Sequence, residues 1–163
     1  MPHPLPSGAL RIGLISDTHS LLRPEAAAFL RGSHLIVHAG DICDPSVIEA
    51  LRAIAPTVAV RGNNDHGAWA ESLRESELIE VGKVVLYAIH DVAEIDIDPE
   101  AAGVRVVVSG HSHQPSADER GGVLFVNPGS AGPRRFKLPI SIAELIVDDD
   151  DVAVRFAELS PPP

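Results

Sequence analysis

Short apolar runs rich in β-branched residues alternate with mixed polar segments along most of the chain, a pattern typical of strands buried in a sheet. Five of these runs end within three residues of a side chain that can bind a metal. They lie at residues 10–16, 35–37, 57–60, 84–89 and 104–109. Open sheets place their reactive groups outside the carboxyl ends of their strands. The five runs therefore predict one shared site.

Helical patterns separate the first strands. Residues 24–31 open with proline and glutamate and are followed by glycine, the expected asymmetry of helix ends. Asp44 provides an N-cap for a second helix, whose apolar positions recur at helical spacing until Pro56. A less regular pattern predicts a third helix at residues 68–75. Residues 98–103 can form two helical turns at most.

The pattern changes after residue 113. Three strand-like runs with no helix between them follow at 123–127, 141–147 and 152–157. Their loops favour antiparallel pairing, and the four aspartates at 148–151 indicate a solvated hairpin turn. An order that begins with alternating strands and helices and ends as a meander fits two packed sheets with helices outside them.

The length of 163 residues predicts a single domain at residues 10–157, with a flexible tail at 1–9 and a proline-rich tail at 158–163. The single cysteine, Cys43, cannot form an internal disulfide, which favours a reducing, cytoplasmic location. No apolar run is long enough to cross a membrane, and the proline-rich N-terminus lacks the pattern of a secretory signal. We expect no membrane association. The sequence leaves the number of assembled chains open, a homo-oligomer included.

The formal net charge of −10 argues against a general nucleic-acid-binding protein, because such proteins need a basic surface. It does not exclude a small anionic substrate, since bound cations would dominate the local field of a metal site.

The candidate ligands are two carboxylates, one amide and four imidazoles. They are Asp17, His19, Asp41, Asn63, His90, His111 and His113. Seven ligands exceed the needs of one tetrahedral zinc ion, whereas two ions that share a carboxylate would use them all. Nitrogen and oxygen ligands without thiolate suit two divalent transition-metal ions. We expect manganese first, with nickel, iron, cobalt and zinc as alternatives.

The spacing within two motifs predicts how their side chains point. Residues i and i+2 of an extended segment lie on the same side. Asp17 with His19, and His111 with His113, should therefore each hold a metal from one direction.

Charge indicates the reaction. Two divalent cations would contribute +4 and two aspartates −2, which leaves a surplus that a hydroxide and a phosphate oxygen can use. Paired ions lower the pKa of a shared water and orient a phosphoryl group for in-line attack. Hydrolysis of a phosphate ester is the reaction that suits this arrangement best.

The ordered motifs resemble those of a known family, the calcineurin-like metallophosphoesterases, and most closely its small single-domain phosphodiesterase branch. The motifs are Asp17-x-His19, Gly40-Asp41, Gly62-Asn63-x-Asp65, His90, Gly110-His111-x-His113 and Asn127-Pro128-Gly129-Ser130. The resemblance covers residues 10–157. It implies an α/β fold, a four-layer α/β/β/α sandwich of two mixed β-sheets flanked by helices.

The resemblance also implies how the ligands are shared. One ion would take Asp17, His19, Asp41 and His113, and the other would take Asp41, Asn63, His90 and His111. Asp41 would then bridge the pair. The activity implied is hydrolysis of a small phosphodiester, with a hydroxide bridging the metals as nucleophile.

Two residues depart from the family pattern. Asn64 stands where many relatives have histidine, and Asp91 stands where the family more often has glycine. An amide can hydrogen-bond a phosphate oxygen but cannot supply a proton at neutral pH, so Asn64 is expected to bind substrate. His66 is the candidate general acid.

Two further residues are candidates to support the ligands from behind. His38 lies within an apolar run and is expected to be a buried, hydrogen-bonded histidine that supports the site. Asp65 either orients a ligand or caps the following helix.

Two alternatives belong to other functional classes. The retromer coat contains a subunit of this fold that serves mainly in assembly, so a non-catalytic scaffold is the first alternative. The second is a phosphomonoesterase. A complete ligand set favours catalysis over the scaffold, and Asn64 favours the diester over the monoester.

Overall fold

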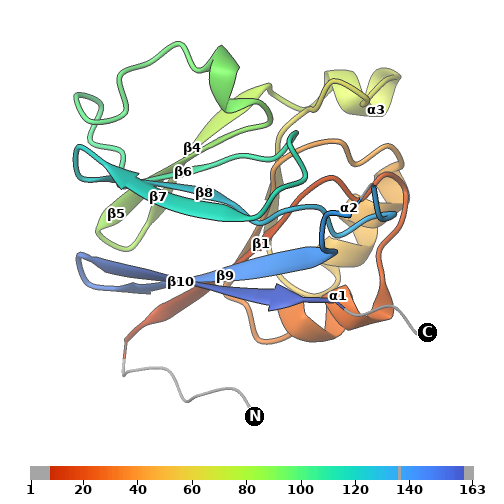
Figure 1. Cartoon of the computed structure of the whole chain (residues 1–163), viewed down its shortest axis with the longest axis horizontal. Helices are drawn as coiled ribbons and strands as arrows, with labels where there is room; N and C mark the ends of the chain where they lie inside the picture. The colour runs from red at the N-terminus through yellow and green to blue at the C-terminus, as the bar shows by residue number, and fades with distance from the viewer. Residues whose placement is uncertain (1–7, 136, 160–163) are drawn as a thin grey trace.

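Two five-stranded sheets pack face to face in the computed structural model, which describes residues 8–135 and 137–159 (Figure 1). The first sheet has the order β10-β9-β1-β2-β3 and the second the order β4-β5-β6-β8-β7. The strands of the first sheet are β1 (Leu10–Ile15), β2 (Leu35–His38), β3 (Thr57–Ala59), β9 (Ser141–Asp148) and β10 (Asp151–Glu158). Those of the second are β4 (Ser76–Val81), β5 (Val84–Ile89), β6 (Val106–Val108), β7 (Ser116–Arg120) and β8 (Val123–Asn127).

Both sheets are mixed, and each contains three adjacent parallel strands. In the first sheet β1, β2 and β3 run parallel, while β9 and β10 are antiparallel. In the second, β5, β6 and β8 run parallel between the antiparallel edge strands β4 and β7. Parallel strands present their carboxyl ends at one edge, so each sheet offers one such edge to the site.

The main core lies between the two sheets, and the strand period sets its composition. On β1, Ile12 and Leu14 face the second sheet, whereas Ile15 faces the opposite way, toward the helices. Leu145 of β9 and Leu86 of β5 fill the same inter-sheet layer and are fully buried.

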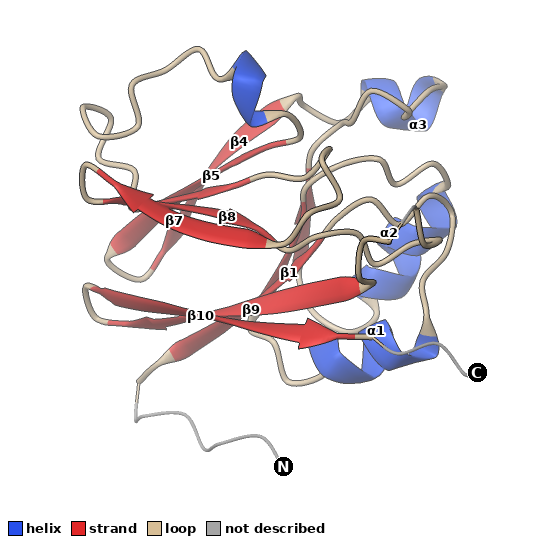
Figure 2. Cartoon of the chain, in the orientation of Figure 1, coloured by secondary structure: helices blue, strands red, loops and turns tan. Residues whose placement is uncertain are grey.

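Helices cover the outer face of the first sheet (Figure 2). These helices are α1 (Pro24–Leu30) and α2 (Pro45–Arg52), and the short α3 (Ala68–Glu71) follows β3. Asp44 caps α2 as predicted, because its side chain accepts a hydrogen bond from the Ser46 amide at 2.9 Å. Leu30 and Leu51 anchor the two longer helices on the sheet.

The outer face of the second sheet is covered by a loop that contains one 3₁₀ turn, η1 (Val92–Glu94). Ile95 and Ile97 of this loop pack on Tyr87 and Val107 of the sheet. The predicted fold class of two mixed sheets with helices outside is confirmed. The fourth layer is thin, because residues 98–103 form turns and no helix.

Three details differ from the expectations. Strand β7 was not predicted, because all five of its residues are exposed and it has no apolar alternation to reveal it. Helix α3 ends at Glu71, short of the predicted residue 75. Strand β8 was expected to pair only in antiparallel fashion. It pairs antiparallel with β7 but parallel with β6, because the chain crosses over between β6 and β8. The predicted hairpin turn at 148–151 is confirmed, with Asp149 in the left-handed region between β9 and β10.

The predicted tails at 1–9 and 158–163 lie mostly outside the described residues. At the C-terminal side, Glu158 belongs to β10 and Leu159 is buried, so the packed domain extends beyond residue 157. Within the described part of the chain, no helix combines the length and the apolar character that a membrane span requires.

Replacement of Leu145 by Ala tests the inter-sheet core. Leu145 is fully buried, so the cavity should lower the free energy of unfolding by about 2–5 kcal/mol. Leu78→Ala on β4 is the matched control, since that side chain is 59% exposed, and its effect should stay within about 0.5 kcal/mol. Urea titrations measure both. Equal losses in the two variants would contradict the assignment of the core.

Candidate metal centre

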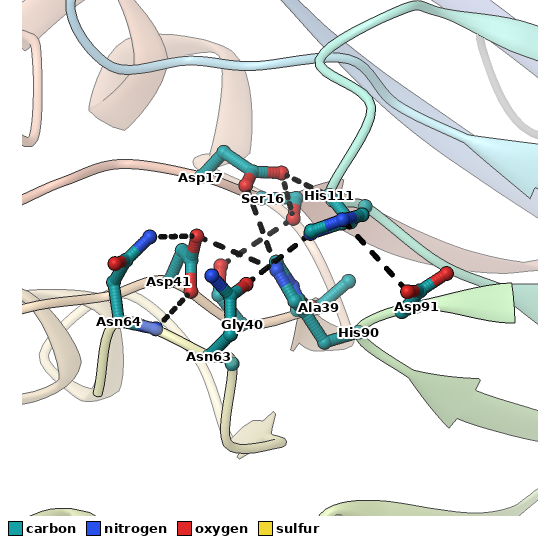
Figure 3. A network of polar contacts seen from close by, with 12 residues as sticks. Ser16, Asp17, Ala39, Gly40, Asp41, Asn63, Asn64, His90, Asp91 and His111 are labelled. Atoms are coloured by element: carbon teal, nitrogen blue, oxygen red, sulfur yellow. Dashed lines mark hydrogen bonds and ion pairs between the residues drawn. The ribbon is translucent and has the colours of Figure 1, made fainter. Parts of the chain in front are cut away.

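Loops after five parallel strands carry the seven predicted ligands, and Figure 3 shows Asp17, Asp41, Asn63, His90 and His111 close together. The ligands follow β1 (Asp17, His19), β2 (Asp41), β3 (Asn63), β5 (His90) and β6 (His111, His113). The first three of these strands belong to one sheet and the other two to its partner. Stacking of the two sheets is therefore what joins the two halves of the site.

One group of possible ligands comprises Asp17, His19 and His113, whose ligand atoms lie within 4.8 Å of one another. The Oδ1 atom of Asp17 lies 3.3 Å from Nε2 of His113 and 3.9 Å from Nε2 of His19. Asp17 is fully buried and His113 nearly so. Such a set can hold a divalent ion.

A second group comprises Asp17, Asp41 and His90 within the same limit. Oδ2 of Asp41 lies 3.4 Å from Nε2 of His90 and 3.7 Å from Nε2 of His19. The carboxylates of Asp17 and Asp41 thus both reach toward both groups. The resemblance assigns the bridge to Asp41 alone, and the geometry gives Asp17 an equal position.

Asn63 and His111 lie beside the second group. Oδ1 of Asn63 is 3.2 Å from Nδ1 of His111, and the rings of His90 and His111 are 5.2 Å apart. Nε2 of His111 faces Asp91, at 3.8 Å from Oδ2. Both Asn63 and His111 are exposed, so this side of the centre is open to solvent.

The hydrogen bond at Nδ1 of His90 indicates which of the two ring nitrogens carries the proton. Nδ1 lies 2.7 Å from the carbonyl oxygen of Ala39, and a carbonyl can only accept, so Nδ1 carries the proton. In the neutral ring Nε2 then directs a lone pair toward the carboxylates of Asp17 and Asp41. Three acceptors facing one another are stabilised by a positive charge between them, either a proton on the imidazole or a metal ion.

Buried atoms without partners support the same conclusion. Six buried side-chain atoms of the described residues lack a hydrogen-bond partner, and four belong to predicted ligands. These four are Asp17 Oδ1, His19 Nε2, His90 Nε2 and His113 Nδ1. Natural proteins rarely leave buried polar atoms unpaired, so this donor set fits divalent metal ions.

The backbone of the centre is strained rather than extended. Five of the seven predicted ligands have φ between 46° and 71°, in the left-handed region. These are Asp17, His19, Asp41, His111 and His113. The expectation that the i, i+2 pairs lie in extended segments is therefore wrong, although Asp17 and His19 do converge on one group of possible ligands. His113 faces Asp17, whereas His111 faces Asn63, because each loop turns sharply after its strand.

Two glycines allow this close packing. A Cβ atom on Gly62 would collide with the carboxylate and amide nitrogen of Asp41, and one on Gly110 would collide with the Ser16 hydroxyl and lie 2.6 Å from Oδ2 of Asp17. The glycines before Asn63 and His111 thus let the two aspartates approach the neighbouring loops.

The local charges favour ionised aspartates. Burial alone would raise the pKa of Asp17, but the close contact with His113, the hydrogen bond from Ser16 and the nearby charges of His90 and His113 lower it overall. Burial likewise opposes ionisation of Asp41, yet His90 and the two hydrogen bonds from Asn64 hold its pKa well below the usual range. For His90, burial lowers the pKa, and Asp41 and Asp17 reverse that effect to a net rise.

His38 is the last residue of β2, contacts the loops that carry Asp17 and Asp41, and is fully buried. The Gly40 amide donates to its Nδ1 at 3.1 Å, so Nε2 carries the proton and donates to Thr18 Oγ1 at 3.0 Å. Burial lowers the pKa of His38 to about 4. This neutral ring fixes the loop residues beside Asp17 and Asp41, a supporting position like the one predicted.

Asp65 binds the backbone of the loop that carries Asp41. Its carboxylate accepts hydrogen bonds from four amides, those of Asp41, Ile42, Cys43 and Gly62, at 2.7–3.0 Å. Helix α3 has Gly67 at its N-cap, so Asp65 does not cap that helix. Of the two alternatives for Asp65, the structure matches the support of a ligand.

Asn64 is hydrogen-bonded to a candidate metal ligand, whereas His66 makes no such contact with a described residue. The backbone and side-chain amides of Asn64 donate to the two carboxylate oxygens of Asp41 at 2.9 and 2.8 Å. His66 is exposed, and no hydrogen bond or ion pair joins its side chain to another described residue. Its catalytic role stays a prediction.

The motif after β8 secures two ligand loops, a role that the sequence analysis did not assign. Nδ2 of Asn127 donates to the Gly110 carbonyl at 2.9 Å and to Ser112 Oγ at 3.0 Å, on either side of His111. The Ser130 hydroxyl donates to the Asp17 carbonyl at 3.0 Å. A buried asparagine and serine bracketing a Pro-Gly turn is the signal that could have revealed this function.

Cys43 adjoins the centre as a neutral thiol. Its Sγ lies 3.5 Å from Nδ1 of His19. Partial burial and the negative charges of Asp65, Asp41 and Asp17 raise the pKa of Cys43 to about 11. The thiolate that would act as a nucleophile is therefore disfavoured at neutral pH.

A pocket of about 400 Å³ opens beside the second group of ligands. Asn63, His90 and His111 line it, together with residues of β4, β5 and the loop around η1. A small molecule in this pocket would contact the candidate metal centre directly.

The comparisons with known proteins agree with this geometry. Residues 10–150 match the calcineurin-like phosphoesterase superfamily domain. The chain is 34% identical over 155 residues to a probable metallophosphoesterase of Methanocaldococcus jannaschii, covering 87% of this chain and 78% of the relative. It is 27% identical over 140 residues to a phosphodiesterase of the same organism, covering 74% and 83% of the two chains.

Solved structures show the same fold. The crystal structure of Vps29 from Chaetomium thermophilum superposes with a TM-score of 0.73 at 22% identity, and the match covers 94% of this chain and all of that one. At this identity the likeness shows the fold alone.

Replacement of His38 by Gln tests the buried neutral imidazole. The pKa of His38 is about 4 in the folded protein against an ordinary 6.5. The unfolded chain therefore binds the proton first as the pH falls, and stabilisation that is complete above pH 6.5 is lost between about pH 6.5 and 4. Wild type should lose up to about 1.4 kcal/mol per pH unit more than His38→Gln in that window. Urea unfolding at several pH values measures the difference, and parallel curves would contradict it.

Proposed function

Because the chain belongs to the calcineurin-like phosphoesterase superfamily, we propose that it is a two-metal phosphodiesterase that hydrolyses a small phosphodiester. The observation that carries this proposal is the convergence of two buried carboxylates and three imidazoles in two groups that share Asp17, with four buried polar atoms left unpaired there. The family match supports phosphoesterase activity, and the choice of a diester rests on the residues of this site.

The proposed ligand sets follow the two groups in the structure. Asp17, His19 and His113 would hold one ion, and Asp41, His90, Asn63 and His111 the other. The carboxylates of Asp17 and Asp41 both lie between the two groups, and Asp41 is proposed as the bridge. Manganese suits this mixture of imidazole and oxygen ligands, and nickel, iron, cobalt and zinc are the other candidates.

The residues of this chain divide the work of hydrolysis. Two divalent ions held by these residues would lower the pKa of a water molecule and neutralise charge on the phosphoryl group. The lowered pKa values of Asp17 and Asp41 keep both carboxylates ionised and able to bind metal ions. His90 is fixed by Ala39 with its lone pair toward the centre. Gly62 and Gly110 leave space for both aspartates.

Asn64 supports the choice of a diester. Its amide nitrogens already bind both oxygens of Asp41, and its exposed position leaves it able to donate to a phosphate oxygen. It cannot protonate a leaving group, which disfavours monoesters with poor leaving groups. We propose His66, two residues further along this exposed loop, as the acid that protonates the departing alcohol.

The remaining features fit a small substrate in a reducing compartment. The net charge of −10 disfavours bulk nucleic acid, and the single cysteine, which cannot form an internal disulfide, agrees with a cytoplasmic location. The scaffold alternative stays open to the same experiment, since fully metallated protein without hydrolytic activity would favour it.

Metal dependence is the first test. Protein loaded with manganese should hydrolyse bis(p-nitrophenyl) phosphate, and chelation should abolish turnover. Asp41→Ala should reduce kcat/KM by more than about 10²-fold, the loss that one electrostatic stabiliser produces, and should lower the metal content found by elemental analysis. Asp150→Ala removes an exposed carboxylate of the β9–β10 turn and is the matched control. Metallated wild type that leaves diesters intact would refute the proposal.

The leaving group tests His66. A p-nitrophenolate departs without a proton, whereas an alkoxide needs one. His66→Ala should therefore slow hydrolysis of a dialkyl phosphodiester, whose leaving group is an alkoxide, by about 10²-fold and barely change hydrolysis of bis(p-nitrophenyl) phosphate. Equal effects on the two substrates would remove His66 from the proton-transfer step, and unaltered metal content would confirm that the variant keeps its centre.

A further inference from the structure

The pocket beside the centre has walls that the metal ligands do not account for. It is bounded by the loop after β3, by the start of β4, by β5 and by the segment around η1. Asn63, His90 and His111 form the side that meets the centre, and His90 is a buried residue whose Nε2 has no hydrogen-bond partner. One arm of a phosphodiester held at the metals would extend into this space.

The opposite walls carry excess negative charge. Four carboxylates line the pocket, and they are Glu75, Asp91, Glu94 and Asp96. Arg61 is the cation among the lining residues, and its Nη2 atom is paired with Oε1 of Glu75 at 2.9 Å. Glu94 and Asp96 form no ion pair with any other described residue. The walls therefore favour a cation and disfavour a second phosphate.

A buried tyrosine gives independent support for a ligand in this pocket. Tyr87, the single tyrosine of the chain, is 3% exposed and lines the pocket. Its hydroxyl forms no hydrogen bond with another described residue. The hydroxyl oxygen is also not among the buried atoms that lack a partner, so it has some exposure to solvent. Because Tyr87 lines the pocket, the hydroxyl is open to it and can bind a polar or charged occupant in place of water.

We propose that this pocket selects phosphodiesters in which one alcohol carries an ammonium group. The phosphate would lie at the centre, and the ammonium would lie among Asp96, Glu94 and the Tyr87 hydroxyl. This inference rests on the proposed phosphodiesterase function and adds the chemical class of the substrate. It also separates the two charges of a zwitterionic substrate, with the anion at the metals and the cation at the acidic walls.

Two isosteric substrates test the proposal. One is the p-nitrophenyl phosphodiester of choline, and the other is its 3,3-dimethylbutyl counterpart, in which carbon replaces the quaternary nitrogen. In both, water adds to phosphorus, the bond to the aryl oxygen breaks, and p-nitrophenolate leaves. At physiological ionic strength, where remote charges are screened, kcat/KM should be about tenfold higher for the choline ester, mainly through KM.

Variants separate the pocket from the overall charge of the protein. Glu94→Gln with Asp96→Asn should bring the ratio of the two kcat/KM values close to one. Glu49→Gln with Asp150→Asn removes the same charge at exposed positions of α2 and the β9–β10 turn, and should leave the ratio unchanged. A ratio that falls equally in both double variants would show a general electrostatic effect and would overturn the proposal.

The single tyrosine provides a readout that needs no turnover. With ¹³C-labelled tyrosine, wild-type protein contains one set of ring signals, all from Tyr87. Tetramethylammonium should shift these signals in a saturable manner, and the Glu94, Asp96 double variant should weaken the shift. Neutral tert-butanol is the control probe. Equal shifts by both probes would contradict a cation site.

The outcomes of these experiments distinguish the proposed selectivity for an ammonium group from the phosphodiesterase function on which it rests. If neither substrate is hydrolysed by metallated protein, the phosphodiesterase proposal fails, and the tyrosine titration still decides whether the pocket binds cations. If both substrates are hydrolysed at equal rates, the activity stands and the proposed selectivity is wrong.

Discussion

The close approach of two buried carboxylates is the constraint on which this structure depends. Asp17 and Asp41 both lie within 4 Å of imidazole nitrogens of His19 and His90, in surroundings where unbalanced charge is costly. Two sheets must stack for these side chains to meet, since Asp17 and Asp41 follow strands of one sheet and His90 follows a strand of the other. The inter-sheet core thus sets the distance between the ligands.

Neutral or backbone-bound groups hold this arrangement in place. His38 connects the loops beside the two aspartates, Asp65 binds four amides of the neighbouring turns, and Asn127 secures the loop around His111. None of the three side chains contacts the candidate metal position itself. The left-handed backbone at five ligands is therefore maintained by the protein scaffold, and the ligands are preorganised before an ion binds.

Much of this could be predicted from sequence, and the failures have physical causes. Apolar runs followed by polar groups located the strand ends and all seven candidate ligands, because burial leaves a strong pattern. The left-handed φ values of Asp17 and His111 left no such pattern, since carboxylate and imidazole residues are also common in extended segments. Strand β7 was missed for the opposite reason, because an exposed edge strand buries nothing that alternates. The acidic pocket depends on which loops meet, which spacing along the chain does not encode.

The thin outer layer over the second sheet has an evolutionary consequence. The segment between β5 and β6 supplies Asp91, Glu94 and Asp96 to the pocket but begins only after the ligand His90. Insertions, deletions or substitutions there can change which molecules the pocket admits, while the candidate metal ligands keep their places at the strand ends. Descendants of one ancestor could in this way come to bind different molecules while keeping the same set of candidate metal ligands.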